Sequence, residues 1–132
     1  MKQPFISLEQ VKKIVKTYPT PFYLYDEKGI RENAARLKQA FSWNRGYKEY
    51  FAVKATPNPF LLNILKDMGC GTDCSSMTEL MMSRACGFSG SDIMFSSNDT
   101  PPEEFAYAEK LGAIINLDDI THIQCLEETL GH

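Results

Sequence analysis

The stretch that decides the fold runs from Tyr50 to Leu117 and reads YFAVKATPNPFLLNILKDMGCGTDCSSMTELMMSRACGFSGSDIMFSSNDTPPEEFAYAEKLGAIINL. In this stretch, short apolar runs alternate with segments whose apolar residues recur at helical spacing. We therefore predict four strands, each followed by a helix. The predicted strands are Tyr50–Val53, Gly71–Cys74, Ile93–Phe95 and Ala113–Leu117. Such alternation is typical of a parallel sheet whose strands are joined by crossover helices.

Capping signals mark where the helices begin. Ser76 and Glu79 have the spacing of a capping box, and Thr100 precedes two prolines and an acidic residue. We assign Ser76, Thr100 and Asp118 to helix capping, with Asp119 as the alternative cap of the last helix. Further helices are expected over Glu27–Phe41 and Pro59–Met68. Nearer the N-terminus, an amphipathic helix opens at Ser7, and Phe22–Tyr25 has the composition of a short aromatic strand.

Two architectures fit this order of elements: part of a (β/α)8 TIM barrel, or an open flavodoxin-like sheet. We favour the barrel, in an α/β fold that holds its first four strand–helix units. A complete barrel needs roughly 250 residues, so the chain would then be an N-terminal part of a larger domain. We expect residues 1–26 to form an N-terminal extension of a helix and a strand. Residues 27–132 would form the N-terminal half of the barrel.

Composition narrows the classes of function. The 132 residues carry a net charge of −3, and 43% are apolar, which suffices for a sizeable core and argues against disorder. No cluster of Lys and Arg suggests a nucleic-acid partner, and no apolar run approaches the roughly 20 residues that span a bilayer. The N-terminus has no apolar signal segment, so we expect a cytoplasmic protein.

The four cysteines are Cys70, Cys74, Cys86 and Cys125, and they form no C-x-x-C pair. The two histidines, His122 and His132, come too late in the chain to complete a zinc set, and H-E-x-x-H is absent. We therefore predict no metal site and interpret the cysteines as reduced thiols of the core.

The chemistry is expected where the parallel strands end, because ligands bind at that edge in either architecture. Each predicted strand is apolar until its last residue and then becomes polar. The side chains expected at this edge are Lys54, Asp73, Ser75, Ser76, Ser96, Ser97, Asn98, Asn116, Asp118 and Asp119.

Lys54 is the most informative of them, because it follows a run that reads as buried strand. Buried lysines are rare, since burial disfavours the ammonium. Two interpretations stay open: Lys54 extends into solvent, or its amine forms a Schiff base. Asp73 lies one strand further along at the same edge, within possible reach of an ion pair with Lys54.

The segments at these strand ends resemble a known family. Residues 19–26 (PTPFYLYD), 50–55 (YFAVKA), 71–76 (GTDCSS), 93–98 (IMFSSN) and 113–118 (AIINLD) are similar to successive blocks of the pyridoxal-phosphate decarboxylases of alanine-racemase-like fold. Within that family they resemble the diaminopimelate decarboxylases most. The resemblance covers the chain from about Tyr18 and corresponds to the family's N-terminal third.

The resemblance implies that Lys54 carries pyridoxal 5′-phosphate and that Asp73 lies beside the cofactor. It implies that Phe22–Tyr25 leaves the barrel and joins a C-terminal β domain. It also implies decarboxylation of meso-diaminopimelate to L-lysine by a full-length homodimer. The family's phosphate loop, its partner for the pyridine nitrogen and its catalytic cysteine would lie beyond residue 132, so we expect the 132-residue chain alone to be inactive.

The chain departs from related patterns in two places. An alanine racemase would be expected to continue its lysine block into a Tyr-Gly-His-Gly run, whereas this chain reads Ala55-Thr-Pro-Asn-Pro59. Many members have a lysine a few residues after the position of Asn98, where this chain reads Asp99-Thr100-Pro101. No role is carried over to those positions. Two alternatives stay open: a decarboxylase of the same fold that acts on ornithine, arginine or carboxynorspermidine, or a non-catalytic protein that binds pyridoxal phosphate.

Overall fold

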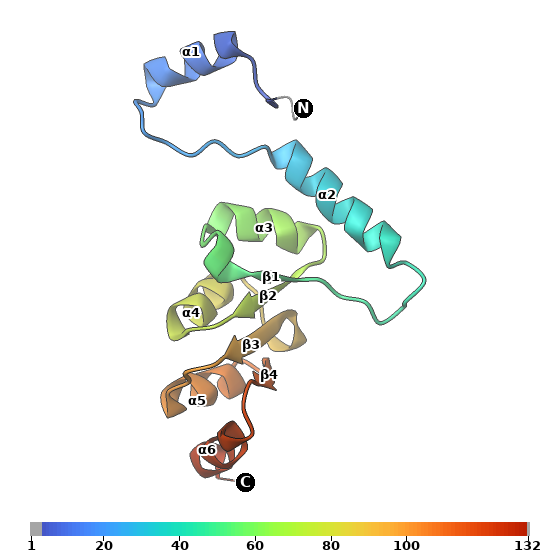
Figure 1. The fold of residues 1–132 in the computed structure, drawn as a ribbon, viewed down its shortest axis with the longest axis vertical. Helices are drawn as coiled ribbons and strands as arrows, with labels where there is room; N and C mark the ends of the chain where they lie inside the picture. Colours follow the sequence, from blue (N-terminus) through green and yellow to red (C-terminus); the bar gives the residue numbers. More distant parts are fainter. Residues whose placement is uncertain (1–3, 132) are drawn as a thin grey trace.

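The computed structural model describes residues 4–131 and alternates strands with helices (Figure 1). Its strands are β1 (Tyr50–Ala52), β2 (Gly71–Cys74), β3 (Ile93–Ser97) and β4 (Ile114–Leu117). Its helices are α1 (Leu8–Thr17), α2 (Glu27–Ala40), α3 (Pro59–Asp67), α4 (Met77–Ala85), α5 (Pro102–Lys110) and α6 (Thr121–Leu130). Short 3₁₀ turns, η1 (Val53–Ala55) and η2 (Gly90–Asp92), follow β1 and precede β3.

The four strands form one parallel sheet in the order β1-β2-β3-β4. A flavodoxin-like sheet would reverse direction after its first crossover and place β1 between two later strands. The sequential order is that of a barrel, in which each new strand is added on the same side. The prediction of four strand–helix units of a barrel is therefore confirmed.

The two faces of the sheet differ in their surroundings. In β3 the burial alternates, so that Ile93, Phe95 and Ser97 are buried while Met94 and Ser96 are half-buried. In β2 Thr72 and Cys74 are buried on the same side as Ile93 and Phe95, as the register requires. Helices cover this side, and the opposite face of the sheet carries the partly exposed side chains.

The core lies between the sheet and helices α3, α4 and α5. It consists of Val53, Leu62, Cys74, Leu80, Phe88, Ile93, Phe95, Phe105 and Ala108. Phe95 of β3 and Phe105 of α5 meet edge to face, with ring centroids 6.1 Å apart. Figure 1 shows the strand–helix units following one another from α3 to α6, so this core continues along the chain from unit to unit.

Local chemistry explains most helix ends. The Ser7 hydroxyl accepts from Gln10 N and the Gln10 side chain accepts from Ser7 N, which is a complete capping box. Gly69 and Gly87 follow α3 and α4 with φ of 85° and 79°, a conformation that glycine adopts without steric cost.

Two capping assignments are wrong. Thr100 makes no capping bond, because Pro101 occupies the cap position of α5 and Thr100 Oγ1 is buried without a hydrogen bond. At α6 it is Asp119, not Asp118, that accepts from Thr121 N at 2.8 Å and from Thr121 Oγ1 at 2.7 Å. Ser76 caps α4 as predicted, since its hydroxyl accepts from Glu79 N.

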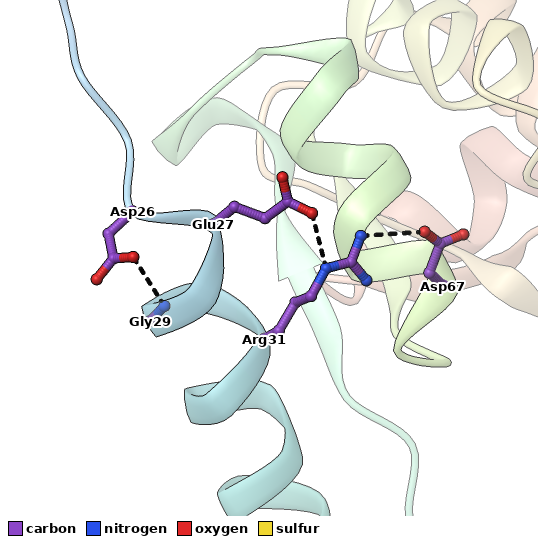
Figure 2. A network of polar contacts seen from close by, with 5 residues as sticks. All are labelled: Asp26, Glu27, Gly29, Arg31 and Asp67. Carbon is purple, nitrogen blue, oxygen red and sulfur yellow. Dashed lines mark hydrogen bonds and ion pairs between the residues drawn. The ribbon is translucent and has the colours of Figure 1, made fainter.

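Helix α2 is joined to α3 by Arg31. Figure 2 shows this side chain between two carboxylates: its Nε donates to Glu27 Oε1 at 2.9 Å, and its Nη2 lies 3.4 Å from Asp67 Oδ2 at the end of α3. Asp26 caps the same helix by accepting from Gly29 N at 3.1 Å. The two ion pairs of Arg31 are exposed to solvent, which weakens their contribution to stability.

The strand predicted over Phe22–Tyr25 does not form. The segment is extended, but within residues 4–131 it pairs with no other strand, and the Tyr23 side chain is 88% exposed. A strand needs a hydrogen-bonded neighbour, and composition alone does not provide one. Helix α1 precedes this segment, has no buried residue and lies away from the sheet in Figure 1. No helix in the described part of the chain is both long and apolar enough to cross a membrane.

Candidate functional site

The polar residues predicted at the strand ends come together at one edge of the sheet. Because the strands are parallel and adjacent in sequence order, Lys54, Asp73, Ser96 and Asn116 follow one another along this edge. The side chains of Asp73, Ser96 and Asn116 belong to the face that helices do not cover. Ser97 points to the covered face and is 8% exposed, so it does not belong to this group.

Lys54 lies just after β1, within the 3₁₀ turn η1. Its neighbour Val53 is fully buried and anchors the turn, and the Thr56 N–H closes it on Val53 O at 3.1 Å. The Lys54 side chain is exposed. The predicted strand Tyr50–Val53 therefore ends one residue early, and the turn presents the amine at the surface instead of inside the strand.

Asp73 is a half-buried carboxyl at this edge. Burial raises its pKa above the usual value, while a hydrogen bond from Ser96 and the charge of Lys54 lower it and Glu79 raises it further. Its Oδ1 atom is buried and makes no hydrogen bond with the described residues. No ion pair within 4 Å joins Asp73 to Lys54 in residues 4–131, so the two charges interact at longer range.

Glu79 organises the loop between Asp73 and α4. Its carboxylate accepts from Ser75 N at 2.9 Å and from the hydroxyls of Ser75 and Ser76 at 3.3 Å each. The spacing of Ser76 and Glu79 predicted a capping box, but the glutamate reaches one residue further back than that motif requires. These contacts fix the chain immediately beyond Asp73.

Ser96 and Asn116 form a pair that the sequence did not single out. They are direct partners in the register of β3 and β4, and Asn116 Nδ2 donates to Ser96 Oγ at 3.1 Å. Each of the two residues is the last but one of its strand. This shared position identifies them as neighbours only when the register of the two strands is known.

Other features lie apart from this edge. Cys74 is fully buried, and burial raises the pKa of its thiol to about 11, which makes it an inert core residue. Among residues 4–131, no three His, Cys, Asp or Glu side chains gather as metal ligands. A cavity of about 390 Å³ lies between α2, α3 and β1, and neither Lys54 nor Asp73 lines it.

The raised pKa of Asp73 predicts a pH-dependent gain in stability for Asp73→Asn. The folded chain binds this proton more readily than the unfolded chain, so the carboxyl's contribution to stability falls as the pH rises from below 3.8 through the raised pKa. At pH 7 the variant should be more stable, by less than about 1 kcal/mol because the site is partly open to solvent. Urea unfolding at pH 3 and pH 7 measures the difference.

Asp99→Asn is the control for this comparison, because Asp99 is an exposed carboxylate just beyond β3. Its substitution should change stability by about 0.5 kcal/mol or less, as is usual for an exposed residue. A gain for Asp73→Asn that is as large at pH 3 as at pH 7 would contradict the assignment of the effect to ionisation.

Comparison with protein families gives one match that spans most of the chain. Residues 27–131 match the family described as pyridoxal-dependent decarboxylase, pyridoxal binding domain. The chain is similar to Protein TabA of Pseudomonas amygdali pv. tabaci, with 43% identity over 107 residues, which are 81% of this chain and 25% of that protein. It is similar to diaminopimelate decarboxylase of Methanothermobacter thermautotrophicus, with 32% identity over 117 residues, covering 88% and 27%.

A solved structure shares the arrangement of these elements. Diaminopimelate decarboxylase from Helicobacter pylori, complexed with L-lysine, superposes with a TM-score of 0.81 at 28% identity, over 92% of this chain and 31% of that one. The chain thus spans between a quarter and a third of the length of these three proteins.

Proposed function

The chain belongs to the pyridoxal-dependent decarboxylase family, as the N-terminal part of its pyridoxal-binding domain, and from this we propose that Lys54 is the residue that carries pyridoxal phosphate and that Asp73 lies beside the cofactor. The observation that carries the proposal is the position of these two residues. They follow consecutive parallel strands at the edge of the sheet where barrel enzymes hold their ligands.

The residues present fit this cofactor. Lys54 offers a primary amine at the surface, on a turn held by the buried Val53. Asp73 offers a buried carboxylate oxygen that is not used by any described residue, which is a ready acceptor for a protonated amine. The face between them and Asn116 is polar and not covered by helices, which leaves room for a ligand.

The roles of the chain's own residues follow from their chemistry. Lys54 would hold the cofactor through its side-chain amine, a group that bonds to aldehydes. Asp73 would supply a negative charge that favours a protonated nitrogen nearby and would hold that nitrogen by a hydrogen bond. When bound, pyridoxal phosphate supplies the electron sink for the charge left at the substrate carbon when carbon dioxide departs. Whenever Lys54 is not bonded to the cofactor, its Nζ atom would hold a proton at the site.

We propose meso-diaminopimelate as the substrate and L-lysine as the product of the full-length protein, acting as a homodimer. Support comes from relatives named diaminopimelate decarboxylase at about 30% identity. TabA, at 43%, carries no substrate in its name, so ornithine, arginine and carboxynorspermidine remain the alternatives within the decarboxylases. A non-catalytic protein that binds pyridoxal phosphate is the alternative outside them. Carbon dioxide release from each of these amino acids by the full-length protein separates the candidates.

The role of Lys54 is tested by trapping the cofactor. The full-length protein that contains this chain is incubated with pyridoxal phosphate, reduced with borohydride and digested, and we expect the pyridoxyl group on the peptide that contains Lys54. Lys66 is the matched control. Its Nζ atom donates hydrogen bonds to Cys86 O at 2.9 Å and to Gly87 O at 2.7 Å, so Lys66 should stay unlabelled. A label on another lysine, with Lys54 unmodified, would overturn the proposal.

A further inference from the structure

The segment between Asp73 and α4 is held by two carboxylates. Ser75 N donates to Oε2 of Glu79, a residue of α4 itself, at 2.9 Å. Met77 N, at the first position of α4, donates to Oε1 of Glu104 at 2.9 Å. Glu79 belongs to the same strand–helix unit as Asp73, whereas Glu104 belongs to α5 of the next unit. Glu104 therefore connects the chain beyond Asp73 to a second unit of the barrel.

The sequence at the start of α5 explains why the Glu104 side chain reaches another helix. Glu104 is the third residue of α5, the position from which a capping-box glutamate accepts from the N–H of its own cap residue. The cap residue here is Pro101, which has no N–H to donate. The carboxylate therefore lacks that partner and accepts from Met77 N of α4 instead. In α1, where the cap residue is Ser7, the third residue Gln10 makes the ordinary bond.

The contact between Glu104 and Met77 is favourable for electrostatic reasons. The first N–H groups of a helix have no partner within the helix and form its positive end, so a carboxylate there satisfies a donor and complements the helix dipole. A hydrogen bond to an ionised acceptor is also stronger than one between neutral groups. The contact is half-buried, which limits its screening by salt. The Glu104 side chain therefore restricts where α4 begins relative to α5.

We propose that Glu104 is a positioning residue of the cofactor site, which fixes the start of α4 and the segment that joins it to Asp73 relative to the next strand–helix unit. The inference rests on the proposed function, since the edge of the sheet needs precise spacing only if it holds a ligand. A ligand bound across several strand ends contacts loops of different units, and a misplacement of about 1 Å can slow a reaction about a hundredfold. Glu104 acts through the backbone that it holds.

The opposite end of α4 is held in a comparable way. There Lys66 of α3 donates from Nζ to Cys86 O at 2.9 Å and to Gly87 O at 2.7 Å, where the helix ends. A cation at the C-terminal end of a helix complements the dipole as a carboxylate does at the N-terminal end. Both side chains attach α4 to a neighbouring helix, but Glu104 does so at the edge where the strands end and Lys66 at the opposite edge.

The first test measures hydrogen exchange at the Met77 amide in the cofactor-free, full-length protein that contains this chain. In Glu104→Ala this amide should exchange about tenfold faster, because it loses a charge-assisted hydrogen bond. Glu104→Gln keeps an oxygen acceptor and should retain most of the protection. Glu103→Ala is the matched control, since it removes an exposed acid from the same turn of α5. An unchanged rate in Glu104→Ala, or an equal rise in Glu103→Ala, would overturn the inference.

The second test asks whether the contact matters for the cofactor. The concentration of pyridoxal phosphate that half-labels Lys54 on borohydride reduction should rise about three- to tenfold in Glu104→Ala and stay near the parent value in Glu104→Gln. In Lys66→Met, which removes the contact at the other end of α4, this concentration should stay unchanged although the helix loses stability.

Two results would overturn the positioning role: an unchanged concentration in Glu104→Ala, or an equal rise in Lys66→Met, which would show that labelling follows the stability of α4. A parent protein in which Lys54 is not labelled at all would instead overturn the proposed function. The exchange rate at Met77 tests the contact independently of that outcome.

Discussion

Replacing Lys54 with alanine is expected to abolish the decarboxylase activity of the full-length protein that contains this chain. Lys54 is the only amine that the sheet edge presents beside Asp73 in residues 4–131, so its removal takes away both the attachment point of the cofactor and a proton-holding group. Its side chain is exposed and makes no hydrogen bond or ion pair with the described residues, so the fold should be unaffected. Carbon dioxide release from meso-diaminopimelate in the presence of excess pyridoxal phosphate measures the loss.

Lys28→Ala is the matched control for this prediction. Lys28 is an exposed lysine of α2, and its one ion pair within residues 4–131 is with Glu32 on the same helix, at 3.7 Å. Its substitution should leave the activity unchanged. If Lys54→Ala retained the parent activity while circular dichroism showed the same fold, Lys54 would not be the residue that carries the cofactor.

Replacing Phe105 with alanine is expected to destabilise the chain by about 3–5 kcal/mol, the usual cost of removing a buried phenylalanine. Phe105 of α5 is 1% exposed and packs against both β3 and α6. It packs edge to face on Phe95 of β3 and on His122 of α6, with ring centroids 6.1 and 5.9 Å away. The cavity left by the substitution would separate α5 from both of them.

Urea unfolding followed by circular dichroism measures this loss. Since small domains are stable by only about 5–15 kcal/mol, the variant should be close to unfolded in buffer. Phe60→Ala is the control, because Phe60 is 81% exposed at the start of α3 and should change stability by about 0.5 kcal/mol or less. Equal effects of the two substitutions would show that α5 is not packed as described.

Structural features that depend on residues close together in the sequence were predicted well, because the sequence patterns that indicate them are local. Strand β2 has the bounds predicted for it, Gly71–Cys74, since the glycine turn that ends α3 and the Ser76 cap of α4 limit it on both sides. Ser7 and Ser76 cap their helices as predicted, because a hydroxyl and the N–H three residues on meet whenever a helix begins there. The polar character of the edge was also predicted, since each strand becomes polar where it ends.

Each wrong prediction has a physical cause. Phe22–Tyr25 has strand composition, but a strand exists only when another segment pairs with it. Thr100 has cap composition, yet the proline after it takes the cap position in α5. Asp118 and Asp119 are both of a residue type that caps helices. The backbone turn before α6 places Asp119, and not Asp118, within hydrogen-bond distance of Thr121 N. Lys54 follows a buried run and is nevertheless exposed, because the strand turns into η1 one residue earlier than its apolar pattern indicates.

The amino-acid sequence alone suffices to predict the alternation of strands and helices from Tyr50 onward, the polar edge of the sheet and the resemblance that points to Lys54 and Asp73. These predictions follow from periodicity, capping and short motifs, which act over a few residues. The strand order β1-β2-β3-β4 is known only from the folded structure, as is the register that pairs Asn116 with Ser96 and turns Ser97 to the helices. Strand order and register are pairings between distant segments, and a shift of one residue would turn every side chain of a strand to the other face.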